Sequence, residues 1–219
     1  MRQSVFRLRV TLSGTKPPIW RRVAVPPDIT LGQLHQVIQR VMGWTDSHLH
    51  QFVLRDKALR PSREEMARQS RQNAWDDAAF FRMRGERVFV PKTTPFGDDT
   101  EMEGEDEDAV TLAEVCPKVK SKVRYDYDFG DGWEHTIEVQ KITEPEPGTE
   151  YPVCLAGKNA CPPDDCGGVW GYYEMLHALE DPSHERHDEY LEWVGEDFDP
   201  QAFDLDQVNA ALAEWRKGA

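Results

Sequence analysis

The sequence predicts an α+β fold: one domain with a mostly antiparallel or mixed central sheet, a helix packed on one face, and C-terminal helices. Two observations support this prediction. Apolar and polar side chains alternate, as in half-buried strands, over five short segments: residues 5–12, 19–25, 48–54, 123–129 and 133–140. Helical spacing with capping residues predicts a helix from Leu31 and further helices after about residue 170. We expect residues 1–219 to form a single domain.

The N-terminal part of the chain predicts a hairpin followed by a helix. Residues 5–12 and 19–25 are separated by Gly14 and two prolines, so pairing them is the economical arrangement. Thr30 and Gln33 have the spacing of a capping box, and Gly43 ends the helix. The apolar stripe of this helix consists of Leu31, Leu34, Ile38 and Val41. His35 flanks that stripe, a position more typical of a packed residue than of a ligand.

The next segment predicts a strand with two histidines and then a less constrained region. His48 and His50 would share a face with Phe52, and two histidines spaced by two on a strand can bind one metal ion. Residues 62–65 can cap a short basic helix to about residue 72, and residues 81–90 can form a hairpin around Gly85. Residues 93–109 are acidic and poor in apolar side chains, so we expect a flexible loop there.

Residues 124–139 predict a tight hairpin around Gly130, Asp131 and Gly132, because glycine tolerates the positive φ of such turns. One face would carry Tyr125, Tyr127, Phe129, Trp133 and His135, and the other Asp126, Asp128, Glu134 and Glu138. Four acids on one face repel one another unless they meet cations or solvent. This hairpin is therefore the first place to look for function.

Three cysteines follow a Pro/Gly/Glu linker at residues 144–150. Cys154, Cys161 and Cys166 lie within 13 residues, and thiolates are good zinc ligands. Their spacing lacks the Cys-x2-Cys knuckle, and a fourth ligand would have to be remote: Cys116, His135 or a carboxylate. A compact loop with free thiols and no cofactor is the favoured interpretation, and a zinc site is the alternative. After it we expect helices at residues 172–179, around 183–194, and from Asp204 with Gln207 as its capping partner.

The charge of the chain is unevenly distributed. The protein is acidic overall, with a net charge of −14. Residues 1–92 carry 17 Lys/Arg and 8 Asp/Glu, or +9, whereas residues 93–219 carry 9 and 32, or −23. We expect the halves to attract each other, with Arg7, Arg9, Arg21 or Arg22 meeting acids of the second half. Nucleic-acid binding through the basic half is the alternative, which the overall acidity disfavours.

The composition also bears on location. The first residues carry arginines without a following apolar stretch, so no signal peptide is expected. The chain contains no apolar run of about 18 residues, so neither a transmembrane helix nor a membrane partner is expected. A soluble cytoplasmic protein is the plain expectation.

Several short motifs resemble one known family. They are residues 18–22 (Pro-Ile-Trp-Arg-Arg), Leu34-His35, residues 43–49, residues 127–135, residues 161–168 and Phe203-Asp204. In this order they resemble the plasmid Ri ORF-three-like family, whose members are often labelled insertion-element passenger proteins of TnpR type. The resemblance covers nearly the whole chain. It implies a compact α+β fold and an association with mobile elements, and it implies no particular activity or serine-recombinase domain.

Two classes of function remain. The first is a non-enzymatic accessory or interaction module, in which the acidic aromatic hairpin and the cysteine loop dock a protein partner. The second is a metal-dependent hydrolase of a phosphoester or similar bond, with an Asp/His cluster around the hairpin from Asp128 to His135. The binding candidates are Trp20, Arg21, Arg22, His48, His50, Asp128, Asp131 and His135; the metal candidates are Cys154, Cys161 and Cys166. The first class is favoured, since Asp at a Gly-Asp-Gly turn is ordinary turn chemistry.

Overall fold

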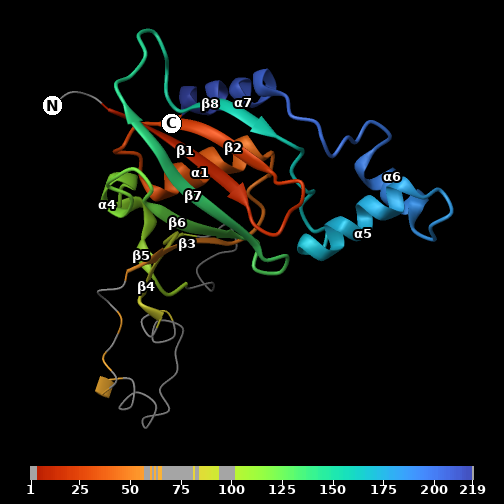
Figure 1. Cartoon of the computed structure of the whole chain (residues 1–219), viewed down its shortest axis with the longest axis horizontal. Helices are drawn as coiled ribbons and strands as arrows, with labels where there is room; N and C mark the ends of the chain where they lie inside the picture. Colours follow the sequence, from red (N-terminus) through yellow and green to blue (C-terminus); the bar gives the residue numbers. More distant parts are fainter. Residues whose placement is uncertain are drawn as a thin grey trace.

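A single twisted sheet organises the molecule (Figure 1). The computed structural model describes residues 4–56, 60, 62, 64–65, 81, 84–93 and 102–218. The sheet has the order β5-β4-β3-β6-β7-β1-β2-β8, and every pair is antiparallel except β4 with β5. Its strands are β1 (Val5–Leu12), β2 (Trp20–Val25), β3 (His50–Arg55), β4 (Glu86–Val90), β5 (Glu105–Asp106), β6 (Lys122–Tyr127), β7 (Trp133–Thr143) and β8 (Val153–Lys158). The predicted α+β class with a mixed sheet is thus confirmed.

One face of this sheet is covered by α1 (Leu31–Met42). The other is polar around β1, β6 and β7 and carries a small buried apolar cluster, Val53, Val88 and Val90, on β3 and β4. The predicted capping box of Thr30 and Gln33 forms, and Gly43 ends the helix with a φ of 96°. The predicted apolar stripe is buried against the sheet, as are the alternate residues of β1 and β7. On the open face Arg124 contacts Asp126 and Glu134, so the acids of the hairpin do meet a cation.

The other helices with defined bounds among the described residues lie around the edges of the sheet. They are η2 (Glu107–Ala109), α4 (Leu112–Val115), α5 (Gly168–Glu180), α6 (His187–Val194) and α7 (Leu205–Gly218). The C-terminal α7 runs beside β8 and α1, while α5 and α6 pack on each other at one end of the sheet (Figure 1). The predicted cap of the last helix is confirmed, because the Gln207 amide donates to the Asp204 carboxylate (2.9 Å). Every helix among the described residues is too short or too polar to cross a membrane.

Several expectations for the middle of the chain were wrong. Part of the acidic segment expected to be a flexible loop forms β5 and η2, because Glu107 finds a buried partner in His50. Residues 94–101 of that segment lie outside the described residues. The hairpin expected at residues 81–90 is also wrong, since Phe81 and Arg84 are helical and β4 pairs with β3 instead. The short basic helix has its Ser62–Glu65 cap, and its continuation from residue 66 lies outside the described residues.

The predicted hairpin of residues 124–139 forms, but Phe129 does not lie on the predicted buried face. Tyr127 pairs with Trp133 across the loop, and Tyr125, Tyr127, Trp133 and His135 are all buried. Phe129, expected on the same face, is 48% exposed, because the chain leaves the strand at Asp128, which has a φ of 55°. The same turn carries Asp128 from the polar face into the interior, where it is 5% exposed.

Arg21 joins α1, β2 and β8 through backbone carbonyls, and it has no acidic partner among the described residues. Its side chain is buried, its Nε donates to the Val41 carbonyl at the end of α1 (2.6 Å), and its Nη1 donates to the carbonyls of Trp20 (3.0 Å) and Lys158 (3.1 Å). The guanidinium also lies 4.6 Å from the Phe203 ring centroid. Burial lowers the pKa of Arg21. The expected attraction between the halves is confirmed at Arg7, which pairs with Glu146 (2.8 Å).

We predict that Arg21→Met destabilises the fold by about 2–4 kcal/mol, because the buried Val41 carbonyl and the part-buried carbonyls of Trp20 and Lys158 lose their donor. Arg22→Met is the matched control. Arg22 is only half-buried and donates to Gln140 (3.0 Å), so its loss should cost less than about 1 kcal/mol. Urea unfolding of both variants measures the difference. Equal midpoints for the two variants would show that Arg21 is not the joint described here.

Candidate functional site

Three loops from distant parts of the sequence converge beside α1. They are residues 43–49, residues 128–132 and residues 159–167. The Trp44 indole donates to the Pro162 carbonyl (3.0 Å), and the Thr45 hydroxyl donates to Asp164 (3.1 Å). The Asp131 carboxylate accepts from the Gly167 amide (3.1 Å). These bonds hold the three loops in one arrangement.

A closed ring of hydrogen bonds, buried at Tyr125 and part-buried at Asp46, fixes the first loop. The Tyr125 hydroxyl contacts His35 Nδ1 (2.8 Å) and accepts from Gln39 Nε2 (2.9 Å). His35 Nε2 contacts Asp46 Oδ1 (2.8 Å), and the Asp46 amide donates to Gln39 Oε1 (3.0 Å). Burial is the main cause that lowers the pKa of His35. Because each polar group in the ring has a partner, the network is a rigid support for residues 43–49.

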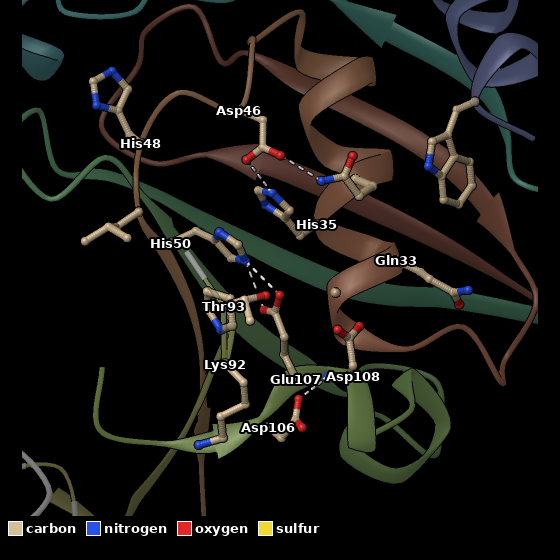
Figure 2. A pocket seen from close by; sticks show the side chains of 15 residues that line it. Gln33, His35, Asp46, His48, His50, Lys92, Thr93, Asp106, Glu107 and Asp108 are labelled. Atoms are coloured by element: carbon tan, nitrogen blue, oxygen red, sulfur yellow. Dashed lines mark hydrogen bonds and ion pairs between the residues drawn. The ribbon is translucent and has the colours of Figure 1, made fainter. Parts of the chain in front are cut away.

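A second histidine stacks on this network and lines a pocket of about 430 Å³ (Figure 2). The His50 ring lies parallel to His35, with centroids 3.5 Å apart, and its Nε2 contacts both oxygens of Glu107 (2.9 and 3.1 Å). The pocket also borders Lys92 and Asp108. Each imidazole therefore already has a carboxylate partner at hydrogen-bonding distance.

His48 points away from that stacked pair (Figure 2) and meets two other carboxylates. Its Nε2 lies 3.6 Å from Asp128 Oδ2 and 3.4 Å from Asp165 Oδ1. Each of the three residues comes from a different one of the converging loops. The ligand atoms of His48, Asp128 and Asp165 all lie within 4.8 Å of one another. We call these three residues the His48 cluster.

The spacing in the His48 cluster differs from that of hydrogen bonds. His48 Nε2 is buried and has no hydrogen-bond partner among the residues that the structure describes. An N–H to carboxylate bond spans about 2.7–3.2 Å, shorter than both distances here. Ligands held about 2.1 Å from a tetrahedral metal ion lie roughly 3.4 Å apart. The cluster therefore has the spacing of ligands around a cation, whereas His35 and Asp46 have that of a hydrogen bond.

The turn geometry aims Asp128 at His48. Asp128 Oδ1 accepts from the amides of Gly130 (2.9 Å) and Asp131 (3.2 Å), which leaves Oδ2 for His48. The Asp128 amide in turn donates to the Leu49 carbonyl (2.9 Å), next to His48 in the chain. The third loop can approach because residue 168 is glycine: a Cβ there would lie 2.3 Å from the Asp131 carbonyl oxygen.

The structure separates several residues that the sequence analysis grouped. His48 and His50 fall in different clusters rather than around one ion. His135 lies in the core beside Tyr125 and Trp44, outside the His48 cluster, and its Nδ1 donates to the Tyr125 carbonyl (3.3 Å). Burial lowers the pKa of His135 to about 4, so its imidazole is neutral. Asp131 is used to hold the Gly167 amide.

The candidates Trp20, Arg21 and Arg22 make contacts that stabilise the fold. Trp20 lies under the guanidinium groups of Arg9 (4.5 Å) and Arg22 (5.5 Å) on the open face of the sheet. Arg21 is the buried joint described above.

The three cysteine thiols are not gathered. Cys154 lies in β8, where a loop was expected, with Sγ 3.6 Å from the Arg22 carbonyl. Burial raises the pKa of Cys154 to about 11, that of Cys166 to about 12, and that of Cys161 as well. Neither potential metal-ligand group found among the described residues contains a cysteine.

The sequence analysis did not identify Asp46, Glu107 or Asp165 as site residues. Asp46 and Asp165 have φ values of 60°, so each looks like an ordinary turn residue in the sequence. Glu107 lies in an acidic run that composition alone assigns to solvent. Only the spacing of Asp46 and His48 within residues 43–49 offered a local signal.

The fold and motifs define a member of a known family. A family model described as plasmid pRiA4b ORF-3-like protein matches residues 4–207. The chain therefore belongs to this family, which confirms the resemblance drawn from its motifs.

Two relatives match nearly the whole chain. The uncharacterized protein y4hQ of Sinorhizobium fredii is 39% identical over 221 residues, covering 99% of this chain and 96% of its own length. The crystal structure of MM3350, a protein of unknown function from Methanosarcina mazei Go1, has a TM-score of 0.72 at 32% identity. That similarity covers 94% of this chain and 97% of the other.

We predict that Gly171→Ala in α5 destabilises the protein by about 1–3 kcal/mol, because the added Cβ would lie 1.9 Å from the backbone carbonyl oxygen of Cys166, so the third loop would have to shift from α5. Elsewhere in a helix this change stabilises by about 1 kcal/mol. Gly218→Ala in α7 is the control, since no atom lies within 4 Å of its added Cβ. Urea midpoints measure both, and a Gly171→Ala protein as stable as the parent would contradict the close contact.

We predict that His135 makes the fold sensitive to acid. Its folded pKa is lowered from 6.5 to about 4, so the unfolded chain binds the proton first as the pH falls. The stabilisation is complete above pH 6.5, and up to about 3 kcal/mol is lost between pH 6.5 and 4. His135→Leu should flatten this part of the profile of unfolding free energy against pH. The exposed control His177→Gln should not, and identical profiles for the two variants would refute the assignment.

Proposed function

We propose that the protein is a metal-dependent hydrolase whose divalent ion is bound by His48, Asp128 and Asp165. One observation carries the proposal: the buried His48 Nε2 has no hydrogen-bond partner among the described residues and lies 3.4 and 3.6 Å from two carboxylate oxygens. One imidazole and two carboxylates suit a first-row ion such as Mn²⁺, Co²⁺ or Zn²⁺.

Three protein ligands leave coordination positions for water and substrate. The Asp165 side chain is 75% exposed and borders a second pocket of about 430 Å³, so the ion would be accessible from solvent. A divalent ion in such an open site lowers the pKa of bound water and polarises a carbonyl or phosphoryl oxygen. These are the two contributions that hydrolysis requires.

The surrounding charge favours a neutral or cationic substrate over a phosphoester. Two ligand carboxylates already balance the charge of a divalent ion. Tyr127 connects Asp164 to the His48 cluster. Its hydroxyl contacts Asp164 Oδ1 (3.4 Å), and its ring centroid lies 5.8 Å from that of His48. Asp131 is adjacent at the turn. An anionic phosphodiester would meet these carboxylates at short range, so an ester or amide is the better substrate class.

A non-enzymatic interaction module is the second candidate, favoured by two exposed tryptophans on α5 and α6. A cytoplasmic location and an association with mobile elements accompany both candidates as proposals from the sequence.

We predict that the purified protein binds one equivalent of Co²⁺ or Zn²⁺ and that His48→Gln, Asp128→Asn and Asp165→Asn each weaken binding by at least about 10–100-fold. Asp128→Asn is informative because the asparagine Oδ1 still accepts the turn amides while the anionic Oδ2 is lost. Calorimetry and Co²⁺ absorption measure the affinity. Metal-dependent hydrolysis of nitrophenyl esters and nitroanilides, lost in His48→Gln, tests the activity.

Two histidine controls locate the ion. His177→Gln changes an exposed histidine outside both clusters and should leave metal affinity unchanged. His50→Gln disrupts the other cluster and should also retain the ion. Binding that survives His48→Gln but is lost in His50→Gln would place the ion with His35 and Asp46 instead. No binding at all would leave His48 as a simple ion pair and refute the proposal.

A further inference from the structure

The pocket beside Asp165 has features that the proposed hydrolysis does not use. It lies between α5 and α6 and is bordered by Trp170, Trp193, Tyr190, Glu174, Glu189 and Arg186. Trp170 is 79% exposed and Trp193 is 46% exposed. We call this site the aromatic pocket. Two exposed tryptophan side chains at one pocket are unusual on a soluble surface and typical of recognition sites.

The charge around the aromatic pocket is strongly negative. Residues 165–199 contain eleven Asp/Glu and a single basic residue, Arg186. Within the pocket, the three carboxylates of Asp165, Glu174 and Glu189 face one guanidinium, so the lining carries a net charge of about −2. This field attracts cations and repels nucleic acids.

The pocket already binds one guanidinium from its own chain. Arg186 Cζ lies 4.2 Å from the Tyr190 ring centroid, a cation–π contact. Its Nη2 and Nε donate to the two oxygens of Glu189 (2.8 and 2.9 Å), and its Nη1 donates to Glu174 (3.2 Å). Trp170 and Trp193 line the same pocket as Asp165, so aromatic side chains and a further carboxylate are also present there. The internal contact thus shows the chemistry that an external cation would meet.

We propose that the aromatic pocket is the docking site for a basic peptide segment of a partner protein, with Arg or Lys side chains packed on Trp170 and Trp193. The charge complementarity and the two exposed indoles support this occupant. The inference goes beyond the proposed hydrolase and does not depend on a bound metal ion.

The test uses the full chain, freed of metal with a chelator, and a fluorescent peptide of alternating Arg and Gly. Anisotropy at physiological salt should show binding. The double variant Trp170→Ala/Trp193→Ala should weaken it about tenfold, since each cation–π contact contributes about 0.5–1 kcal/mol. Val119→Ala, at an exposed apolar residue elsewhere, should leave the affinity unchanged.

A second variant is expected to have the opposite effect on peptide affinity. Arg186→Ala frees the Tyr190 face and two carboxylates, so it should tighten binding of the peptide several-fold, and added guanidinium ion should reverse the gain. Circular dichroism checks that α5 and α6 remain folded in Arg186→Ala. If they unfold, the peptide affinities of the tryptophan variants decide the proposal.

Three outcomes would overturn the proposal. Absence of peptide binding at physiological salt is the first. Unchanged affinity in the double tryptophan variant is the second, because it would assign binding to general negative charge. The third is a concentration-dependent dimer that Trp170→Ala dissociates, since the occupant would then be a second copy of this chain.

Discussion

The buried hydroxyl of Tyr125 is the constraint on which the site depends. It lies in the middle of β6 under α1, where an unpaired hydroxyl would be costly, and it is satisfied by His35 and Gln39. Burial raises the pKa of Tyr125, so the hydroxyl keeps its proton. Because both partners also bind Asp46, the hydroxyl sets the position of residues 43–49 relative to the sheet. The position of His48, which lies in this segment, is fixed by the same contacts.

The two histidine clusters therefore have different roles. In one, every contact between His35, His50 and their carboxylates is at hydrogen-bonding distance, and the result is rigidity. In the other, the buried His48 Nε2 lies 3.4 Å from Asp165 Oδ1, which is too far for a normal hydrogen bond. A rigid network beside an unsatisfied group is the usual arrangement of a functional site, where loops carry chemistry on a fixed scaffold. The three loops that form the site are also those that hold three of the family motifs.

The elements predictable from the sequence were those with local signals. Alternation identified five strands, and the capping residues Thr30 and Gln33 located α1, because each pattern is complete within its own segment. Strand β5 was missed because it has only two residues, and β8 was missed because its sequence, Val-Cys-Leu-Ala-Gly-Lys, shows no clear alternation and its pairing partner β2 is distant in sequence. Glu107 looked solvated because its partner, His50, lies 57 residues away in sequence. Asp128 and His48 were identified singly, but their meeting with Asp165 depends on three loops that only the fold brings together.

Among the described residues, ion pairs between the basic and acidic halves balance only part of the charge asymmetry. Arg7 meets an acid of the second half, whereas Arg21 binds carbonyls and Arg22 binds an amide. The acids around α5 and α6 have Arg186 as their one basic neighbour in sequence, so much of the negative charge there is not balanced locally. A divalent ion at His48 would lower the repulsion among the converging aspartates, and a basic partner would lower it on the outer surface. Both proposals therefore follow from one electrostatic property: this end of the molecule attracts cations.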